Sequence, residues 1–197
     1  MTSPVTARDR AKAERSDAIL REAARLFAER GYNGVSLEDI GAAVGVSGPA
    51  VYRHFAGKQA LLGAVLVKVS EDLVEGGTRV ATEGRSAEAR MRALVEFHVE
   101  FALGHADVIR VHDREVAQLA AGDHSDVRRL QRAYIELWMQ TLAPLVDADA
   151  EELRLRVQAC FGLINSTPHS TRAATRAHSA TATVLAAMAE SALRATT

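Results

Sequence analysis

The chain has 197 residues, of which 48% are hydrophobic and 25% are charged. These proportions are those of a folded globular protein, and they exclude a disordered tail, a collagen-like fibre and a small disulfide-stapled scaffold. The formal net charge is −1, so the molecule as a whole has no basic field. Any nucleic-acid binding must therefore depend on a local patch.

Cellular location is constrained only weakly. The one cysteine, Cys160, excludes an intrachain disulfide and a multi-cysteine zinc site. No apolar run approaches the roughly 20 residues that a spanning helix needs. The N-terminal region is charged from Arg8 to Arg15 and lacks the apolar stretch of a signal peptide. We therefore expect a cytoplasmic protein that needs no membrane and no cofactor.

Apolar residues recur with helical period along most of the chain, which predicts an all-α protein of about nine helices. No segment alternates apolar and polar residues long enough to predict a strand. From the glycine stops and Ser/Thr/Asp starts, the expected helices cover 9–30, 37–44, 48–54, a long helix from 57–58 that weakens at Gly76–Gly77, then 87–103, 107–120, 124–145, 149–166 and 172–194. Pro168 is expected to end the helix over 149–166.

The first sixty residues have the pattern of a helix-turn-helix, in which one helix crosses the DNA backbone and the next enters the major groove. Ser36 with Asp39 resembles a capping box at the start of the first of these helices. Gly45 suits the tight turn, and Ser47 is the expected N-cap of the recognition helix. Residues 1–60 have a net charge of +2 and residues 61–197 a net charge of −3, which agrees modestly with this placement.

Small residues at the start of the recognition helix allow its backbone to approach the bases, and the polar residues that follow supply donors for phosphates and base edges. Lys58, at the start of the next helix, is an expected phosphate contact. The predicted DNA-binding residues are Ser36, Ser47, Gly48, Pro49, Ala50, Tyr52, Arg53, His54 and Lys58.

Residues 19–62 resemble the DNA-binding domain of the tetracycline-repressor (TetR/AcrR) family. The resemblance rests on Ile19-Leu20, Ala23-Ala24, Leu26-Phe27, Gly31-Tyr32, Ile40, Gly45-Val46-Ser47, Val51-Tyr52, His54-Phe55, Lys58 and Leu61-Leu62. It covers roughly a quarter of the chain and is specific, because so many positions recur at fixed spacing. Gly41 departs from the family, which usually has alanine there, and glycine inside a helix costs about 1 kcal/mol relative to alanine.

The resemblance implies a homodimer that binds a palindromic operator and leaves it when a small molecule binds the C-terminal domain. It implies a DNA-binding domain over 1–60 and an effector-binding and dimerisation domain over 61–197. It also implies that the last two long helices, 149–166 and 172–194, form the dimer interface. Ala177, Ala180, Ala187 and Ser191 independently give the last helix a smooth seam for close packing, although an alanine-rich surface helix is the alternative.

The expected ligand pocket is mostly apolar with a few polar anchors, as small-molecule sites usually are. The predicted ligand-binding residues are Phe97, His98, Phe101, Ile109, His112, Tyr134, Trp138, Phe161 and Asn165. This inventory, together with a looser resemblance of 113–138 and 161–167 to a subgroup linked to lipid metabolism, favours a hydrophobic or amphipathic effector. A fatty-acyl or acyl-CoA-type molecule and an aromatic compound both fit.

Other functions have weaker support. His98, His105 and His112 lie seven residues apart, but Gly104 interrupts the helix between them, so no metal site is predicted. Arg128, Arg129 and Arg132 form either an anion site or a solvated basic face. No phosphate loop, nucleophile elbow or catalytic pair is present, so we expect no enzyme and no catalytic residues. A protein-interaction module with a vestigial helix-turn-helix remains the alternative to a DNA-binding repressor.

Overall fold

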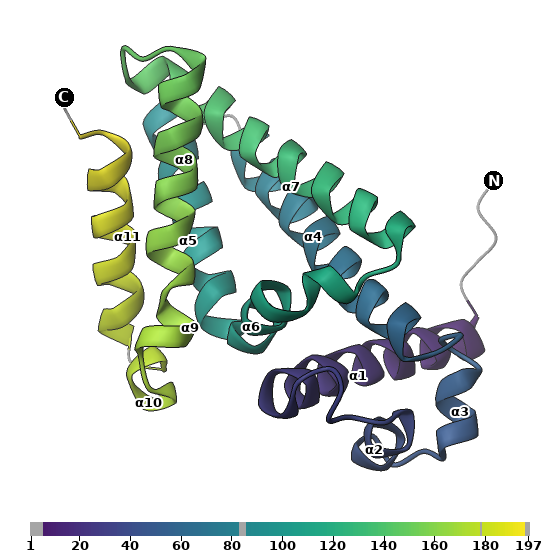
Figure 1. Cartoon of the computed structure of the whole chain (residues 1–197). Helices are drawn as coiled ribbons and strands as arrows, with labels where there is room; N and C mark the ends of the chain where they lie inside the picture. The colour runs from purple at the N-terminus through teal and green to yellow at the C-terminus, as the bar shows by residue number, and fades with distance from the viewer. Residues whose placement is uncertain (1–5, 83–85, 178, 196–197) are drawn as a thin grey trace.

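The computed structural model of the chain describes residues 6–82, 86–177 and 179–195, and within these ranges it contains helices and no strand (Figure 1). The α-helices are α1 (Ala7–Arg30), α2 (Leu37–Ala43), α3 (Gly48–Tyr52), α4 (Lys58–Thr82), α5 (Ala87–Gly104), α6 (Ala106–Glu115), α7 (Ala121–Leu142), α8 (Ala150–Asn165), α9 (Thr167–Ser170), α10 (Ala173–Arg176) and α11 (Ser179–Leu193). Short 3-10 turns follow α6 at Val116–Gln118 and α7 at Ala143–Leu145.

The all-α prediction is confirmed, but the C-terminal helices differ from those expected. Pro168 does not simply end a helix: α8 stops at Asn165, and Pro168 lies in the first turn of α9, where a missing N–H has little cost. The single helix expected over 172–194 is divided into α10 and α11. The helix expected over 107–120 ends at Glu115 and continues only as a 3-10 turn.

Glycines that were expected to weaken α4 instead permit close packing. The helix runs on to Thr82 through Gly76 and Gly77. A Cβ atom at Gly76 would lie 2.4 Å from the Phe97 ring, and one at Gly77 would lie 2.6 Å from the Tyr134 ring. Both glycines are buried, so α5 and α7 can press aromatic side chains against the α4 backbone. The sequence shows the missing side chains but not the rings that use the space.

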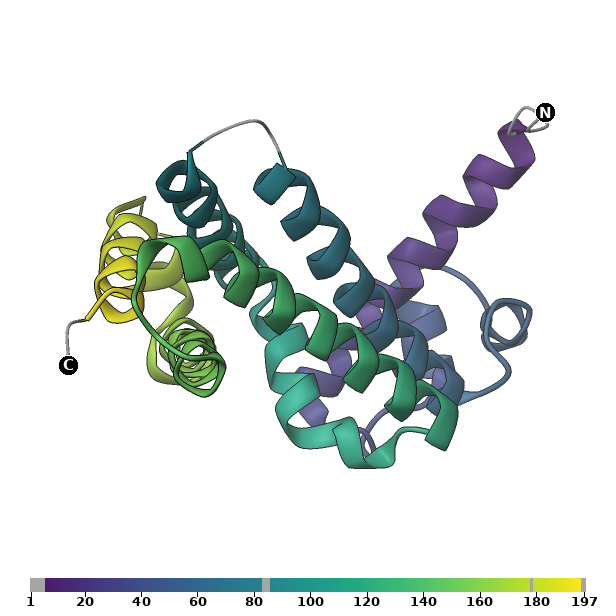
Figure 2. The same ribbon diagram turned by 90° about the horizontal axis from the view of Figure 1, so that it is seen from above.

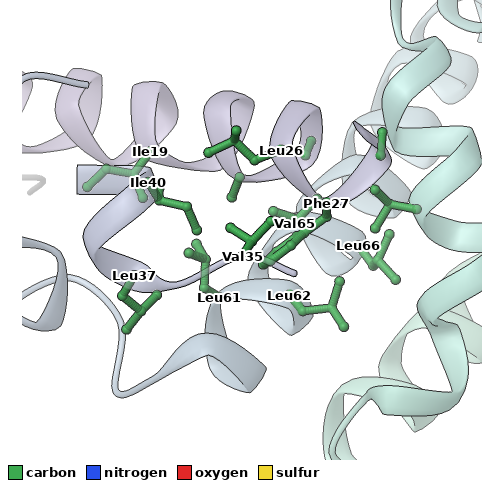
Figure 3. Packing of buried hydrophobic residues seen from close by; sticks show 14 of the residues in the cluster. Ile19, Leu26, Phe27, Val35, Leu37, Ile40, Leu61, Leu62, Val65 and Leu66 are labelled. Atoms are coloured by element: carbon green, nitrogen blue, oxygen red, sulfur yellow. The ribbon is translucent and has the colours of Figure 1, made fainter. Parts of the chain in front are cut away.

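One hydrophobic cluster joins the N-terminal helices to the start of α4 (Figure 3). Ile19 and Phe27 of α1, Ile40 of α2, and Leu61 and Leu62 of α4 are completely buried in it. The cluster continues into Val111 of α6 and Val127 of α7. The N-terminal three-helix unit is therefore packed against the rest of the chain rather than tethered to it.

A second hydrophobic cluster fills the space between α5, α7, α8 and α11, with Leu94, Trp138, Val157 and Leu193 among its fully buried members. Helix α4 contributes to both clusters, since Leu66 lies in the first and Ala81 in the second. The ribbon shows α4 and α7 crossing the middle of the molecule, with α5, α8 and α11 on one side and α1 to α3 on the other (Figure 1). Within the described ranges, no helix is both long and apolar enough to cross a membrane.

Candidate DNA-binding face and effector cavity

Helices α2 and α3 are joined by a tight turn that matches the predicted one. Gly45 has a φ of 71°, in the left-handed region that favours glycine. The N–H of Val46 donates to the carbonyl oxygen of Gly41 at 2.9 Å, which closes the turn onto α2. A Cβ atom at Gly41 would lie 2.9 Å from the Val46 carbonyl oxygen. The glycine that departs from the family pattern therefore lies where the turn packs closely on α2.

The starts of α2 and α3 are capped differently. At α2, the Ser36 hydroxyl accepts from the Asp39 N–H at 3.0 Å, and the Asp39 carboxylate accepts from the Ser36 N–H at 2.8 Å. This reciprocal pair is the expected capping box, and its hydrogen bonds lower the pKa of Asp39. Ser47 occupies the N-cap position of α3, but its side chain makes no capping hydrogen bond. Its exposed hydroxyl is thus not committed to capping the helix.

Seven of the nine predicted DNA-binding residues lie between the N-cap of α3 and His54, just after the helix, which ends at Tyr52 rather than at 54. The other two lie elsewhere, Ser36 at the start of α2 and Lys58 at the start of α4. Tyr52 is 54% exposed, and Pro49 and Arg53 are also exposed, whereas Ala50 is buried. His54 is partly buried, and burial, followed by the charges of Lys12, Arg53 and Arg15, lowers its pKa. These charge effects show that basic residues of α1 lie near the end of α3.

The N-terminal turns of α1 project away from the body of the protein (Figure 2). Residues 6–15 are all exposed, and they include Arg8, Arg10, Lys12 and Arg15. A capping box between Thr6 and Asp9 starts the helix and lowers the pKa of Asp9. The sequence placed these cations near DNA only as a general possibility; the structure brings Lys12 and Arg15 close to His54.

Lys58 has structural contacts that the sequence did not suggest. Its ammonium group donates to the carbonyl oxygens of Tyr32 at 2.9 Å and Val35 at 3.0 Å, and lies 4.4 Å from the centre of the Tyr32 ring. Lys58 therefore fixes the loop between α1 and α2 to the start of α4. Any contact it makes with phosphate comes in addition to this structural role.

A cavity of about 120 Å³ lies between α4, α5, α6, α7 and the end of α8. Six of the nine predicted ligand-binding residues line it: His98, Phe101, Ile109, His112, Tyr134 and Asn165. Trp138 and Phe161 do not line the cavity but pack around His98, with ring centres 5.7 Å and 4.6 Å from its own. Phe97 lies elsewhere, against Gly76 and in a larger cleft of about 780 Å³ between α1, α4 and α5.

The cavity and the larger cleft are neighbours. Val69, Leu73, Phe101 and Val108 line both spaces, so the cavity and the cleft share part of their walls. The cleft carries charges of both signs, including Arg21, Lys68 and Arg79 on one hand and Asp17 and Glu100 on the other. A molecule with an apolar end and a polar end can therefore place the first in the cavity and extend the second toward the cleft. Sequence patterning gave the apolar inventory but not this arrangement.

Several cavity side chains already have polar partners. Gln131 Nε2 and His112 Nε2 lie 2.6 Å apart, and His169 Nε2 and the Asp113 carboxylate 2.9 Å apart. The Ser70 hydroxyl donates to the Leu66 carbonyl oxygen at 2.7 Å. By contrast, His98 Nε2 and Asn165 Oδ1 are buried without a hydrogen-bond partner in the part of the chain described. Burial lowers the pKa of His98 to about 4, so the imidazole is neutral near pH 7.

Helix α6 connects the cavity to the DNA-binding helices. Ile109 and His112 line the cavity, and Val111 lies in the N-terminal hydrophobic cluster. At the end of α6, Glu115 Oε1 accepts from the Tyr32 N–H at 3.0 Å, and Arg114 donates to the Ala28 carbonyl oxygen at 3.4 Å. One helix therefore touches both the cavity and the loop that Lys58 holds.

The alternative chemistries find little support in the described residues. No group of three or more His, Cys, Asp or Glu side chains is arranged there to hold a metal ion. His105 stacks on Phe101, and Arg129 pairs with Asp126 at 3.0 Å. Cys160 is completely buried, and burial raises the pKa of its thiol to about 12, which disfavours the nucleophilic thiolate.

Two family patterns match consecutive parts of this chain. The pattern of bacterial regulatory proteins of the tetR family matches residues 19–65, and that of the tetracyclin repressor-like C-terminal domain matches residues 84–169. The chain belongs to the TetR family of transcriptional regulators. This assignment covers both the helix-turn-helix and the helices around the cavity, so transcription regulation and DNA binding follow for the chain.

The similarity to known proteins extends over most of this chain. The HTH-type transcriptional repressor KstR2 of Rhodococcus jostii is 27% identical over 168 residues, or 85% of this chain and 82% of the relative. A TetR-family regulator from Bordetella parapertussis has the same fold, with a TM-score of 0.78 at 24% identity over 90% of this chain and 93% of its own. AibR, solved with isovaleryl coenzyme A and operator DNA, has a TM-score of 0.71 at 22% identity over 89% and 96% of the two chains.

Proposed function

We propose that this TetR-family protein is a dimeric repressor that binds a palindromic operator through α3 and is released by a small hydrophobic or amphipathic effector. The observation that carries the proposal is the position of α6, which lines the cavity through Ile109 and His112 and accepts a hydrogen bond from the α1–α2 loop at its last residue, Glu115. A molecule that enters the cavity and shifts α6 necessarily disturbs the loop beside α2. We infer a cytoplasmic location, with residues 1–60 and 61–197 as the two functional parts.

The proposed DNA contacts are Ser36, Ser47, Gly48, Pro49, Ala50, Tyr52, Arg53, His54 and Lys58, in which the small residues permit approach and the polar ones donate hydrogen bonds. The proposed effector contacts are the six predicted residues that line the cavity. Of the other three predicted residues, Phe97 lines the neighbouring larger cleft, and Trp138 and Phe161 pack around His98. An acyl-CoA-type effector would place its acyl group in the cavity; AibR, a protein of the same fold, was solved with isovaleryl coenzyme A. KstR2, which is similar to 85% of this chain, is a transcriptional repressor, and this similarity favours repression over activation.

The proposed dimer uses α8 and α11, which pack side by side (Figure 1). Leu155 of α8 is 65% exposed, and Val184 and Met188 of α11 are 55% and 51% exposed. Ala187 and Ser191 are exposed as well, so the expected smooth seam lies on the outer face of α11. Ala177 lies before α11 and does not share that helix. Exposed large apolar side chains on these two helices are what a second copy would cover.

The test is a footprint of the purified protein on DNA upstream of its own gene, at two salt concentrations, with selection from genomic fragments if that region is not protected. The proposal expects a protected palindrome and an affinity that falls steeply with salt, because phosphate contacts release counterions. Failure to select any specific DNA would contradict it and favour the interaction-module alternative. Acyl-CoAs, fatty acids and aromatic compounds are then screened for release of the selected DNA.

A further inference from the structure

The cavity of about 120 Å³, called the inner cavity below, has buried polar atoms on its wall that lack hydrogen-bond partners among the described residues. Most polar groups on its wall are already paired within the protein, as shown above for His112, Asp113 and Ser70. In the part of the chain that the structure describes, two buried atoms on this wall have no partner: His98 Nε2 and Asn165 Oδ1. A buried polar atom without a partner costs about 1–3 kcal/mol, so the cavity wall favours an occupant that supplies both hydrogen bonds.

The hydrogen-bonding roles of these two atoms are complementary. Tyr134 Oη lies 3.4 Å from His98 Nδ1. Burial raises the pKa of Tyr134, so its hydroxyl keeps its proton and can donate to Nδ1. In a neutral imidazole this leaves the proton on Nε2, which becomes a donor. Asn165 Oδ1 is an acceptor, and the Asn165 side chain lies close enough to His98 for a hydrogen-bonding interaction that raises the pKa of His98 against the larger effect of burial. The geometry of this contact nevertheless leaves both atoms without a formed hydrogen bond. A single hydroxyl group satisfies both, since it accepts from His98 and donates to Asn165.

The charge of the wall restricts the occupant further. Among the described residues, no lysine or arginine lines the cavity, and Asp113 is the one carboxylic acid on its wall. His98 is neutral near pH 7 because it is buried. An anionic group would therefore enter without a counter-charge and beside a carboxylate. Asp113 is already bonded to His169 and lies 3.5 Å from His112, which leaves it a poor partner for a cationic ligand.

The size and walls of the cavity fit a single ring. Its volume is about 120 Å³, and a cavity of about 150 Å³ in another protein accommodates benzene. Phe101 and Tyr134 line it, and Phe161 stacks on Tyr134 with ring centres 5.5 Å apart. Aromatic walls favour a planar partner that packs in offset or edge-to-face geometry.

We propose that the inner cavity binds an uncharged aromatic ring that bears a hydroxyl group, with the hydroxyl joining His98 to Asn165. This inference rests on the proposed function, because it specifies the chemical class of the effector at the same site. The ring is either a whole small molecule or the buried end of a larger one that continues past Phe101 into the larger cleft between α1, α4 and α5.

The experiment is calorimetric titration of the full chain at pH 7.5 with phenol, toluene, benzoate and benzylamine, in parallel with isovaleryl coenzyme A. We expect phenol to bind at least about tenfold more tightly than toluene, because toluene leaves both buried atoms unpaired. We expect benzoate and benzylamine to bind more weakly than phenol, because each brings a charge into the cavity. This comparison uses the unaltered protein and does not depend on any variant folding.

Asn165→Leu removes the acceptor and keeps a similar volume, so the preference for phenol over toluene should fall to within about threefold. Gln140→Leu is the matched control, since it removes an exposed amide from α7 outside the cavity and should leave the preference unchanged. Equal binding of phenol and toluene, a preference for benzoate, or an unchanged preference in Asn165→Leu would overturn the proposal.

The operator complex separates this inference from the function on which it rests. If the protein binds a specific palindrome and isovaleryl coenzyme A releases it while phenol does not bind, the ring proposal is wrong and the regulatory function stands. If no specific DNA is bound, the regulatory function itself fails. If phenol binds with the stated preference and also weakens operator binding, both are supported.

Discussion

The carboxylate of Glu115, the last residue of α6, accepts a hydrogen bond from the backbone N–H of Tyr32 at a distance of 3.0 Å. The carbonyl oxygen of the same Tyr32 accepts from Lys58 at 2.9 Å. The backbone between α1 and α2 is thus held from two sides, by a helix of the cavity and by the start of α4. Eighty-three residues separate Glu115 from Tyr32, so only the folded chain brings the two together.

Replacing Glu115 with alanine should weaken this connection. We expect Glu115→Ala to lower the free energy of unfolding by about 1–3 kcal/mol, because it removes a partly buried hydrogen bond to a charged acceptor. Glu115→Gln keeps an acceptor oxygen and should recover at least half of that loss. Urea unfolding of both variants measures the difference. If alanine and glutamine behave alike, the hydrogen bond does not stabilise the loop.

Variants of Tyr52 and Lys58 should both bind the operator more weakly, but only the Lys58 variant should also be less stable. Tyr52 is 54% exposed, so Tyr52→Phe should leave the free energy of unfolding within about 0.5 kcal/mol and weaken operator binding through loss of a phosphate contact. Lys58→Met should weaken operator binding and also destabilise the protein by about 1–2 kcal/mol, because two carbonyl oxygens lose their donor. Operator titrations and urea unfolding on the same samples separate these effects. A Lys58→Met protein of normal stability would contradict the structural role.

Stability should depend on pH through His98. Burial lowers its pKa to about 4 in the folded protein, below the ordinary value of 6.5. As the pH falls below 6.5, His98 becomes protonated in the unfolded chain but stays neutral in the folded protein. The free energy of unfolding therefore decreases until the pH reaches about 4, where His98 is protonated in the folded protein as well. Between pH 7 and pH 5 this loss is about 2 kcal/mol. The curve for a His98→Gln variant should be flatter by that amount. Parallel curves would show that His98 does not cause the dependence.

Gly77 should not tolerate a larger residue. A Cβ atom there would lie 2.6 Å from the Tyr134 ring, so we expect Gly77→Ala to cost about 1–3 kcal/mol despite the better helix propensity of alanine. Gly122→Ala is the matched control, because no atom of the described residues lies within 4 Å of a Cβ atom at Gly122. Thermal unfolding compares the two variants. A stabilised Gly77→Ala protein would mean that the ring moves away without cost.

The dimer proposal predicts a defect from a charge on the outer face of α11. Met188 is 51% exposed in the single chain, so Met188→Arg should leave the fold intact. If a second copy covers this face, the buried charge should favour the monomer. Ala133→Arg introduces the same charge at an exposed position of α7 and should have no effect on mass. Sedimentation equilibrium measures the mass of each variant in solution. A Met188→Arg protein that remains a dimer would contradict this interface.

Local chemistry determined much of the protein. The capping box at Ser36, the left-handed Gly45 and the apolar period of Ile19, Leu26 and Phe27 act over a few residues, so the helix-turn-helix and the all-α fold were predictable from the sequence. The chemical types of the cavity residues were predictable in the same way. Helical period shows which side of a helix is apolar but not which other helix covers it.

Only the tertiary structure decided which apolar side chains surround space and which fill it. Phe97 and Phe101 share one helix and one residue type, yet only Phe101 lines the inner cavity, because Gly76 admits the Phe97 ring against α4. The hydrogen bonds of Glu115 and Lys58 to the α1–α2 loop, and the unpaired atoms of His98 and Asn165, also arise between segments far apart in the chain. Such contacts depend on how whole helices pack, and a periodic pattern along one helix does not show which other helices lie beside it.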